Sequence, residues 1–497
     1  MATVPRLAIA AVLAVVLLAV AWALPHVRHR VIHAITYDDG TPGPSVRFPD
    51  VKRTPAMQPL VPADRVRVVL VDGLAEANTR DLPAWRELCD RGLALEIDVG
   101  FPTVSLPVEV ALWSGLTQQQ TGVLMRSDHP LVPPLAGGIP SKVPGSRAVA
   151  EDHGWIVRSL GFADARPPAE RDDPVQDADP VAWREVWLAR AREAVASDAR
   201  LVFVHVLRVD TMGHRAGRAS PLYAATAGQA DAIVGELVAM SPDARWFLLS
   251  DHGHLDDGGH GGEERELRRV EGCIAGPGVA HPSARGRGGP IHIVDVARAI
   301  ADSVGVTLDA RSPARPLPTA LAAPFDGDQA VPALPLTTGA LVIFLIVAGA
   351  AASYVAAGRW WLWPWWFPVA CASLALVRGL PTLSMTMVYA PAGRAMYVTW
   401  LPSLVLAAIA TYFGLARTSL PRALIAQLAL PVAALAAVIT ACGAWRTIFG
   451  ASIAPVVPHY TAWLSALLLL SAHGAAAVAL GIVARCVRTL RVPAAAA

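Results

Sequence analysis

The sequence predicts an α/β domain with a mainly parallel sheet flanked by helices, followed by an α-helical membrane domain. Short apolar runs alternate with amphipathic segments over residues 63–320, as strands and helices do in such a domain. From residue 337 onward, apolar segments long enough to cross a bilayer follow one another. The 497-residue chain is 54% apolar and only 16% charged, which is too apolar for one large soluble protein.

The N-terminal residues 1–30 contain an uninterrupted apolar run over residues 7–24, just long enough to span a bilayer. We expect a transmembrane helix or signal anchor here. The alternative is a removed signal peptide, cleaved after the small residues at 21–23. Either interpretation predicts that the following segment is exported. Residues 31–62 are rich in proline and have little periodicity, which indicates a stalk.

The soluble region, residues 63–320, alternates strand and helix signals. Its run over residues 201–207 is almost continuously apolar, which is typical of a strand covered on both faces. The predicted strands are residues 66–71, 94–99, 155–157, 201–207 and 246–249. The predicted helices are residues 80–91, 108–113, 181–196, 223–240 and 292–303.

Residues 321–336 form a predicted linker, and residues 337–497 a predicted transmembrane domain of five spans. The spans lie near residues 337–357, 361–378, 396–416, 423–442 and 460–484. Arginine is more frequent in the loops on one side, which favours six spans in total with both termini in the cytoplasm. We therefore expect a multi-pass protein of the cytoplasmic membrane whose α/β domain is extracytoplasmic. The net charge of +2 gives no indication of a nucleic-acid partner.

The five cysteines form no recognisable disulfide framework and no metal-binding CxxC spacing. Cys371, Cys442 and Cys486 lie in or beside the apolar C-terminal segments. Only Cys89 and Cys273 remain in the polar region. Cysteine usage therefore does not settle the compartment.

Residues 250–262 combine carboxylates and histidines with many glycines. They follow the predicted strand 246–249, whose end would deliver Asp251 and His252 to one edge of the sheet. The glycines let the backbone turn back, so that His260 can approach the same point. Carboxylate with imidazole suits Zn²⁺ or a similar divalent ion. The alternative is a glycine-rich surface loop that happens to contain histidines.

Further candidate ligands follow two other predicted strands. Asp72 ends the strand at 66–71, and Asp210 follows the strand at 201–207 with His214 four residues later. Residues at the carboxyl ends of parallel strands converge at one edge, where open α/β sheets build their sites. Asp72 could instead cap a helix, and His214 could be an ordinary histidine.

Thr103 lies between a predicted strand and a helix start, where free N–H groups and the helix dipole favour an anion. Threonine is a poor nucleophile unless a metal or a base removes its proton, although this residue could also be an ordinary N-cap. We expect two divalent ions, as in two-metal sites for displacement at phosphorus. One ion would be held by Asp72, Asp251 and His252 together with the Thr103 oxygen as a further metal ligand, and the other by Asp210, His214 and His260.

Four separated motifs lie between about Val66 and Gly278. They are Val71-Asp72-Gly73; Pro102-Thr103-x-Ser105-x-Pro107; His205-x-Leu207-x-x-Asp210-Thr211-x-Gly213-His214 with a downstream Asp231; and Ser250-Asp251-His252-Gly253 with His260-Gly261. In these motifs and in their order the sequence resembles the alkaline phosphatase superfamily, and within it the GPI ethanolamine phosphate transferases, which have a catalytic domain like that of type I phosphodiesterases and nucleotide pyrophosphatases.

The resemblance implies an alkaline-phosphatase-like catalytic domain over residues 63–320, a phosphorylated Thr103 and a di-zinc site. It also implies a membrane-anchored transferase that moves phosphoethanolamine, or a similar phospho-group, from a phospholipid donor such as phosphatidylethanolamine to a glycan or lipid hydroxyl. The alternatives are a membrane-bound phosphodiesterase or phosphatase that hydrolyses a lipid or nucleotide phosphodiester, and a non-catalytic membrane scaffold. Five C-terminal spans are fewer than the eukaryotic transferases carry, which indicates a trimmed bacterial relative.

Two positions depart from these transferases and are weak candidates for substrate contact. His254 stands where the transferases usually have Met, and Glu109 belongs to a pair, Val108-Glu109, that replaces their frequent Gly-His. The alternatives are a solvated loop residue for His254 and a solvated helix residue for Glu109.

Overall fold

The structure, a computed structural model, divides the chain into two compact units, Asp38–Ala330 and Met1–Tyr37 with Val331–Ala497. Each unit is described by itself. The described residues are 48–49, 58–123, 134–166, 180–256, 258–262, 264–279, 289–325, 336–359, 363–364, 422, 425–434, 436–437 and 440. The predicted spans at 7–24, 396–416 and 460–484, most of the span at 361–378 and most of the stalk lie outside these residues.

The Asp38–Ala330 unit is built on an eight-stranded sheet in the order β4-β3-β5-β1-β6-β7-β2-β8. β7 runs antiparallel to its neighbours β6 and β2, and the other neighbouring pairs are parallel. The strands are β1 Val66–Val71, β2 Leu93–Asp98, β3 Arg147–Ala150, β4 Asp164–Arg166, β5 Leu201–Val206, β6 Arg245–Leu249, β7 Arg269–Ala275 and β8 Ile291–His292. The predicted α/β class with a mainly parallel sheet is confirmed.

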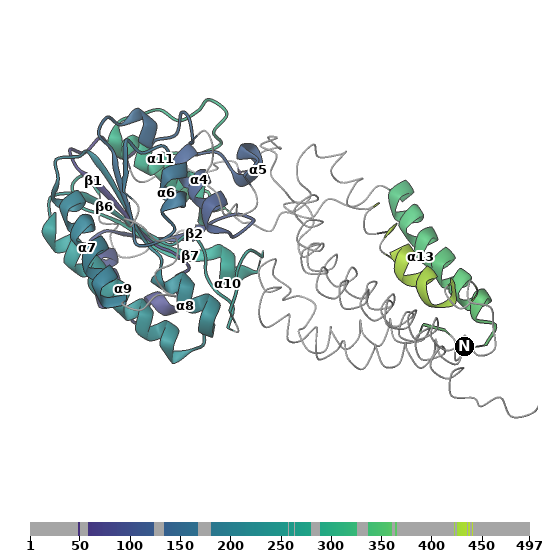
Figure 1. Cartoon of the computed structure of the whole chain (residues 1–497). Helices are drawn as coiled ribbons and strands as arrows, with labels where there is room; N and C mark the ends of the chain where they lie inside the picture. The colour runs from purple at the N-terminus through teal and green to yellow at the C-terminus, as the bar shows by residue number, and fades with distance from the viewer. Residues whose placement is uncertain are drawn as a thin grey trace, which may run out of the picture. The chain divides into compact units, whose positions relative to one another are not determined.

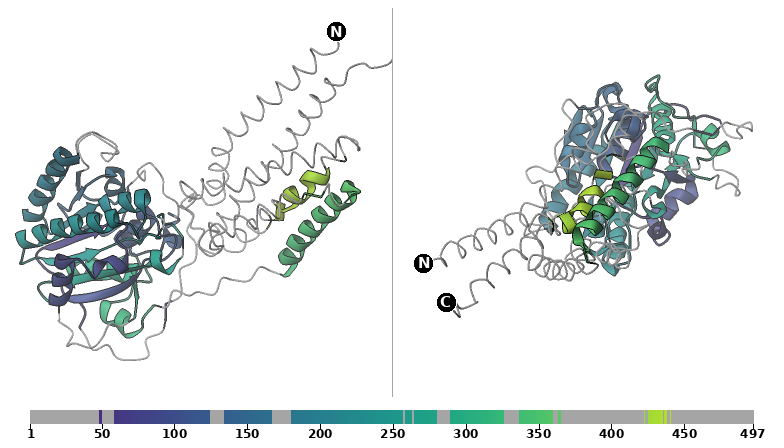
Figure 2. Two further views of the ribbon diagram at one scale, coloured as in Figure 1. Left: turned by 90° about the horizontal axis from the view of Figure 1, so that it is seen from below. Right: turned by 90° about the vertical axis from the view of Figure 1, so that its right-hand side faces the viewer.

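Two layers of helices cover the two faces of this sheet (Figure 1), and Figure 2 shows the unit from two further sides. Alternate side chains along each strand point to opposite faces, so each layer has its own buried core. One layer contains α4 (Ser105–Ser114), α6 (Gly154–Ser159) and α11 (Ile293–Val304). The other layer contains α3 (Pro83–Arg91), α7 (Pro180–Ala196) and α9 (Pro221–Met240).

The register of the central strands decides which residues meet at the sheet edge. Val71 of β1 pairs with Val206 of β5, and Leu70 pairs with Leu249 of β6. β1, β5 and β6 therefore end at the same edge of the sheet. The segments that follow them, including Asp72 after β1, start from this edge.

Asp231, the downstream residue of the third motif, has a structural role. Its carboxylate accepts hydrogen bonds from the backbone N–H groups of Ala84 (2.9 Å) and Trp85 (2.7 Å) at the start of α3. Free N–H groups at a helix start need such an acceptor. Asp231, which lies in α9, thereby fixes α3 to α9.

The predicted strand at residues 155–157 is wrong, because these residues lie inside α6. A run of three apolar residues cannot distinguish a strand from a buried helix segment by its periodicity. The prediction also omitted β3, β4, β7 and β8, which are short or interrupted by charged residues. The remaining helices of this unit are α2 Glu76–Thr79, α5 Gln118–Thr121, the 3₁₀ helix Pro140–Lys142, α8 Arg208–Ala216, α10 Arg265–Arg268 and α12 Leu317–Ala322.

A disulfide joins Cys89 of α3 to Cys273 of β7, with a Cα–Cα distance of 5.1 Å. The two residues are 184 positions apart in the sequence. Sequence reasoning isolated this pair in the polar region but had no signal for a bond, because only the fold brings α3 against β7.

The other unit contains α13, Leu336–Ala357, a 22-residue helix that is long and apolar enough to cross a membrane. Within the described residues it is the only such helix, and length and composition alone are weak evidence for a span. Gly349 lets it approach the helix Ile425–Ala434 closely, since a Cβ at this glycine would lie 2.2 Å from Ala433 Cβ. The five-span domain stays a prediction.

Candidate metal centre

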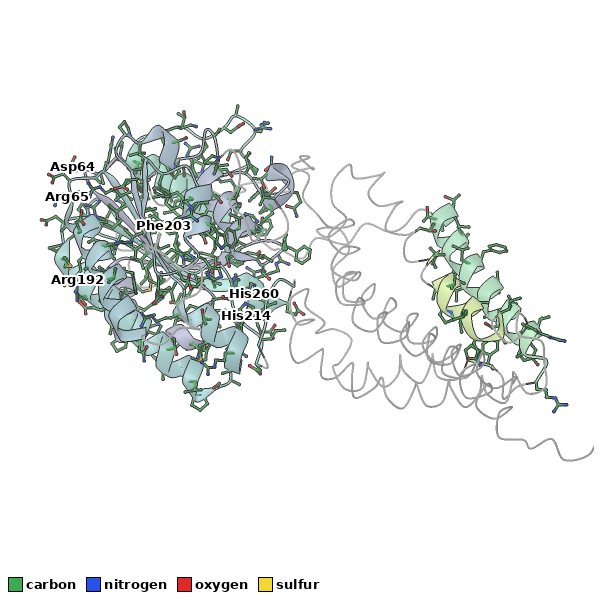
Figure 3. All side chains as sticks on the ribbon, in the orientation of Figure 1. Asp64, Arg65, Arg192, Phe203, His214 and His260 are labelled. Carbon is green, nitrogen blue, oxygen red and sulfur yellow. A yellow bond between two sulfur atoms is a disulfide. The ribbon has the colours of Figure 1, made fainter. Side chains whose placement is uncertain are left out.

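Asp72, Asp210 and Asp251 lie at the edge where β1, β5 and β6 end. Asp72 directly follows β1, and Asp251 follows β6 by two residues. Asp210 lies in the first turn of α8, which begins just after β5. All three residues are buried. Figure 3 shows this edge through His214 and His260, which lie far from Arg65 at the opposite end of β1.

The first cluster joins Asp72, Asp251 and His252. The His252 Nε2 atom lies 3.3 Å from Asp72 Oδ1 and 3.4 Å from Asp251 Oδ2. On the other side of the ring, Nδ1 lies 3.1 Å from the carbonyl oxygen of Gly253, which can accept a hydrogen bond but cannot donate one. Nδ1–H therefore donates to this carbonyl, and Nε2 presents its lone pair to the carboxylates, as metal-binding histidines do.

The second cluster surrounds one carboxylate oxygen with imidazoles. Asp210 Oδ1 lies 3.4 Å from Nε2 of His214, 3.3 Å from Nε2 of His260 and 3.0 Å from Nε2 of His254. The Nε2 atoms of His214 and His260 are 2.9 Å apart, and both side chains are labelled in Figure 3. Asp210 and His214 meet because positions i and i+4 of a helix share one face.

Burial and neighbouring charges shift the pKa values of these groups in opposite directions. Burial, with the nearby charge of Asp72, raises the pKa of Asp251 well above its usual value. Burial would also raise the pKa of Asp210, but the imidazoles around it, led by His214, hold this pKa well below its usual value. Burial, with His260 nearby, lowers the pKa of His252 well below its usual value.

The geometry of the cluster around Asp72 and Asp251 suits a divalent cation. Asp251 Oδ2 is buried and has no hydrogen-bond partner among the described residues, while Oδ1 accepts from the N–H groups of Gly73 and His252. A cation between Asp72 and Asp251 would relieve the repulsion between their charges and satisfy this oxygen. Buried carboxylates mixed with neutral imidazoles are a donor set for Zn²⁺ and similar ions.

Thr103 is fully buried and lies just ahead of α4. The N-cap of this helix is Val104, so the interpretation of Thr103 as an ordinary N-cap is wrong. The Thr103 hydroxyl donates to the carbonyl of Gly262 (2.7 Å) and accepts from the N–H of Gly261 (2.9 Å). The loop that carries His260 therefore holds the hydroxyl in place.

Ser105 is a second hydroxyl at the site, and it had no role in the sequence-based prediction. Its Oγ lies 3.3 Å from His252 Nε2 and 3.5 Å from Asp72 Oδ1. Its place in the second motif was visible in the sequence, but nothing there gave its orientation. Tests of Thr103 therefore need this residue as a comparison.

Glu109 and His205 form a buried group behind Asp72. The His205 Nε2 atom lies 3.1 Å from Asp72 Oδ2 and 3.1 Å from Glu109 Oε1. Burial alone would lower the pKa of His205, but Glu109 and Asp72 together raise it well above its usual value. Burial raises the pKa of Glu109. The interpretation of Glu109 as a solvated helix residue is therefore wrong.

His254 is also fully buried, so its interpretation as a solvated loop residue is wrong as well.

The structure brings the predicted ligands together in two neighbouring groups. The groups are in contact through the rings of His252 and His260, which stack with their centroids 3.7 Å apart. Whether these residues bind two ions, and which ions, stays a prediction.

Comparison with known proteins identifies the segment that carries half of this centre. Residues 143–257 match the family model of type I phosphodiesterase / nucleotide pyrophosphatase. This segment includes Asp210, His214, Asp251 and His252. A comparison with curated proteins found no match.

Solved structures with a similar fold include three from different enzymes. A 2-O GAG sulfatase has a TM-score of 0.38 at 16% identity, covering 56% of this chain and 77% of the other. Murine ectonucleotide pyrophosphatase / phosphodiesterase 5 has a TM-score of 0.34 at 12% identity, covering 51% and 97%. Phosphonate monoester hydrolase from Silicibacter pomeroyi has a TM-score of 0.39 at 14% identity, covering 54% and 78%. These values are too low to carry an argument on activity.

The class of the protein follows from the sheet, the buried site and the family match together. The family match and the buried Asp/His cluster indicate a phosphoryl-transferring or phosphoryl-hydrolysing enzyme. Residues 143–257 are similar to the type I phosphodiesterase / nucleotide pyrophosphatase family. The narrower resemblance to GPI ethanolamine phosphate transferases is not addressed by this match and stays a prediction.

Proposed function

We propose that the chain is a membrane-anchored, metal-dependent transferase of phosphoethanolamine or a similar phospho-group, which acts through a phosphorylated Thr103. The observation that carries the proposal is that the Thr103 hydroxyl is hydrogen-bonded to Gly261 and Gly262, in the loop that also supplies His260 to the metal-binding cluster. A hydroxyl held at a cluster of metal-binding groups is what covalent phosphoryl transfer requires.

The residues of the chain divide the work between two half-reactions. The Thr103 hydroxyl loses its proton and its oxygen attacks phosphorus; a Thr–O–P bond forms, the bond from phosphorus to the leaving alcohol breaks, and the departing alkoxide takes up a proton. An acceptor hydroxyl then loses its proton and attacks the same phosphorus, the Thr–O–P bond breaks, and the Thr103 oxygen regains a proton. The Gly261 N–H stays directed at the Thr103 oxygen and can stabilise its negative charge when the proton is lost.

Divalent ions bound by this centre would lower the pKa of the hydroxyl and neutralise charge on the phosphoryl oxygens. The first would be held by Asp72, Asp251 and His252, and the second by Asp210, His214 and His260. This donor set suits Zn²⁺, because it combines imidazoles with carboxylates.

A membrane setting favours a lipid donor. The helix Leu336–Ala357 supports membrane association, and the further apolar segments of the sequence extend it to the proposed multi-pass topology with an extracytoplasmic catalytic domain. A phospholipid such as phosphatidylethanolamine is then the donor at hand, and a glycan or lipid hydroxyl the acceptor. The five predicted C-terminal spans, fewer than the eukaryotic transferases carry, favour a bacterial source.

The family match favours a second candidate function. Type I phosphodiesterases and nucleotide pyrophosphatases, as their names state, cleave phosphodiester or pyrophosphate bonds. A membrane-bound phosphodiesterase would use the same Thr103 chemistry and pass the group to water instead of an acceptor hydroxyl.

One incubation separates these functions. The purified full chain, loaded with Zn²⁺, is incubated with head-group-labelled phosphatidylethanolamine, with and without a glycan acceptor. A transferase releases diacylglycerol and moves the label to the acceptor. Free labelled phosphoethanolamine without any acceptor would favour the phosphodiesterase. If the chain catalyses no reaction and retains no metal after incubation with Zn²⁺, the result would support the non-catalytic scaffold and contradict both enzyme functions.

A further inference from the structure

His254 contributes a third imidazole beside Asp210, although the sequence gave it no place in the metal centre. Its Nε2 lies 3.0 Å from Asp210 Oδ1, closer than the corresponding atoms of His214 (3.4 Å) and His260 (3.3 Å). The side chain is fully buried. Its role must therefore be found in its contacts within the protein.

His252 and His260 have the ring orientation of metal ligands. Nδ1 of His252 lies 3.1 Å from the carbonyl oxygen of Gly253, and Nδ1 of His260 lies 2.8 Å from the carbonyl oxygen of Thr103. A carbonyl accepts but cannot donate, so Nδ1 carries the proton in both rings. Nε2 of each ring then carries the lone pair with which a histidine binds a metal ion.

His254 has the opposite arrangement. Its Nδ1 is buried without a hydrogen-bond partner among the described residues, whereas its Nε2 faces the Asp210 carboxylate. A proton on Nε2 forms a charge-assisted hydrogen bond to Asp210. A proton on Nδ1 would leave a donor buried without an acceptor, unlike the Nδ1 protons of His252 and His260, which face carbonyl oxygens. The contacts therefore place the proton on Nε2.

We infer that His254 is a positioning residue, which donates from Nε2 to Asp210 and holds this carboxylate for a metal ion bound with His214 and His260. The inference rests on the proposed function, because it requires a metal ion at this centre. A ring that donates from Nε2 has no lone pair there, so His254 is not itself a ligand. Outer partners of this kind orient the ligand and tune metal affinity.

Two glycines provide the space for the His254 ring. A Cβ at Gly213 would lie 2.4 Å from Cδ2 and Nε2 of His254, and a Cβ at Gly73 would lie 2.9 Å from the same Nε2. Gly213 lies inside α8, where alanine would be favoured over glycine by about 1 kcal/mol. The glycine thus weakens the helix locally, and its structural benefit is room for the ring.

Metal affinity of the purified full chain tests the inference. Zn²⁺ binding is measured in competition with a chelator, and stoichiometry by elemental analysis, for His254→Gln and His254→Leu. Glutamine keeps an N–H donor, whereas leucine keeps comparable bulk without one. We expect His254→Leu to weaken one of the metal sites by roughly 10–100-fold and His254→Gln to bind nearly as the parent does. The visible bands of the Co²⁺-loaded chain should keep their positions in His254→Gln.

Three results would overturn the inference: equal losses in the two variants, shifted Co²⁺ bands in His254→Gln, or unchanged affinity in His254→Leu. The first two would make the ring a ligand. Gly213→Ala supplies an independent arm, since it should weaken binding in the parent chain but add little to His254→Ala, where the displaced ring is absent. A parent chain without metal contradicts the proposed function itself. A parent that binds metal, with variants that match it, contradicts only the role of His254.

Discussion

The carbonyl oxygen of Thr103 accepts a hydrogen bond from Nδ1 of His260 at 2.8 Å, so the backbone of the predicted nucleophile orients a predicted metal ligand. This contact uses the main chain of Thr103 and leaves its side chain for the hydrogen bonds with Gly261 and Gly262. A change of the Thr103 side chain therefore removes the hydroxyl and keeps the partner of His260. A substitution of Thr103 can therefore test the role of its hydroxyl in the reaction without removing the hydrogen bond that orients His260.

The first prediction is that Thr103→Ala abolishes turnover and retains metal. The loss in rate should be about 10³-fold or more, as for other covalent nucleophiles. Thr103→Ser, which keeps a hydroxyl, should retain part of the activity. The measurements are turnover of the labelled lipid, metal content, and trapping of the labelled phosphoprotein.

Ser105→Ala is the comparison for this prediction, because the Ser105 hydroxyl lies 3.3 Å from His252 Nε2. We expect this variant still to form the labelled phosphoprotein, at a reduced rate. Labelling that persists in Thr103→Ala and disappears in Ser105→Ala would assign the nucleophile to Ser105 instead.

The second prediction concerns stability behind the metal centre. Glu109→Ala removes one carboxylate from His205 and leaves the buried imidazolium with Asp72 alone. Removing one partner of a buried ion pair typically costs about 3–5 kcal/mol of unfolding free energy. Glu109→Gln keeps the shape and should cost less. Denaturant unfolding of the purified chain measures both variants.

Glu193→Ala is the matched surface control, since Glu193 pairs with Arg147 but its side chain is 58% exposed. An exposed pair contributes at most about 1 kcal/mol. Equal effects of Glu109→Ala and Glu193→Ala would mean that the buried pair with His205 does not stabilise the fold.

Long apolar strands and helices could be predicted from the sequence. β1, β5 and β6 form the centre of the sheet, and their predominantly apolar runs were recognisable. The edge strands were not, because β8 has two residues and β4 has three, too few for a periodic pattern. The run at 155–157 failed for the same reason, since its helix is only six residues long.

The site was predictable where a residue type follows a strand end. Asp72 and Asp251 met because parallel strands bring their carboxyl ends together. The places of Glu109 and His205 could not be predicted, because their contact joins α4 to β5, and sequence spacing carries no information on that packing. The orientation of the His254 ring could not be predicted from the sequence either, because the position of its proton depends on Asp210, which only the fold brings to Nε2.

The third prediction is a pH dependence of stability from His292, the N-cap of α11. Burial lowers the pKa of His292 from 6.5 to about 4 in the folded chain. The folded state therefore favours the neutral ring. Its contribution is fully present above pH 6.5 and is lost as the pH falls towards 4, which amounts to about 3 kcal/mol of unfolding free energy.

His292→Asn is the control for this dependence. Nδ1 of His292 accepts from the N–H of Val294, and asparagine can replace that cap without titrating. The variant should lose less stability between neutral and acidic pH in denaturant unfolding. Parallel pH curves for the two proteins would contradict the assignment to His292.

The fourth prediction is that Cys89 and Cys273 are oxidised in the purified protein. Their Cα–Cα distance of 5.1 Å is within the range of disulfides. Under oxidising conditions, Cys273→Ser should lower the unfolding free energy by roughly 2–5 kcal/mol. A reductant should destabilise the parent chain and leave the variant unchanged. Free thiols on alkylation of the unfolded parent, without prior reduction, would count against the bond.

The last prediction concerns the side of the membrane on which this chemistry takes place. A disulfide between α3 and β7 persists in an oxidising compartment and is rare in the bacterial cytosol, which agrees with export of residues 63–320. Arginine in the loops between the apolar C-terminal segments favours both termini in the cytoplasm. A reporter active only in the cytoplasm should therefore work when fused after Ala497, and one active only outside should work when inserted within residues 163–178. The reverse pattern would place the catalytic domain in the cytoplasm and exclude a lipid donor from the outer leaflet.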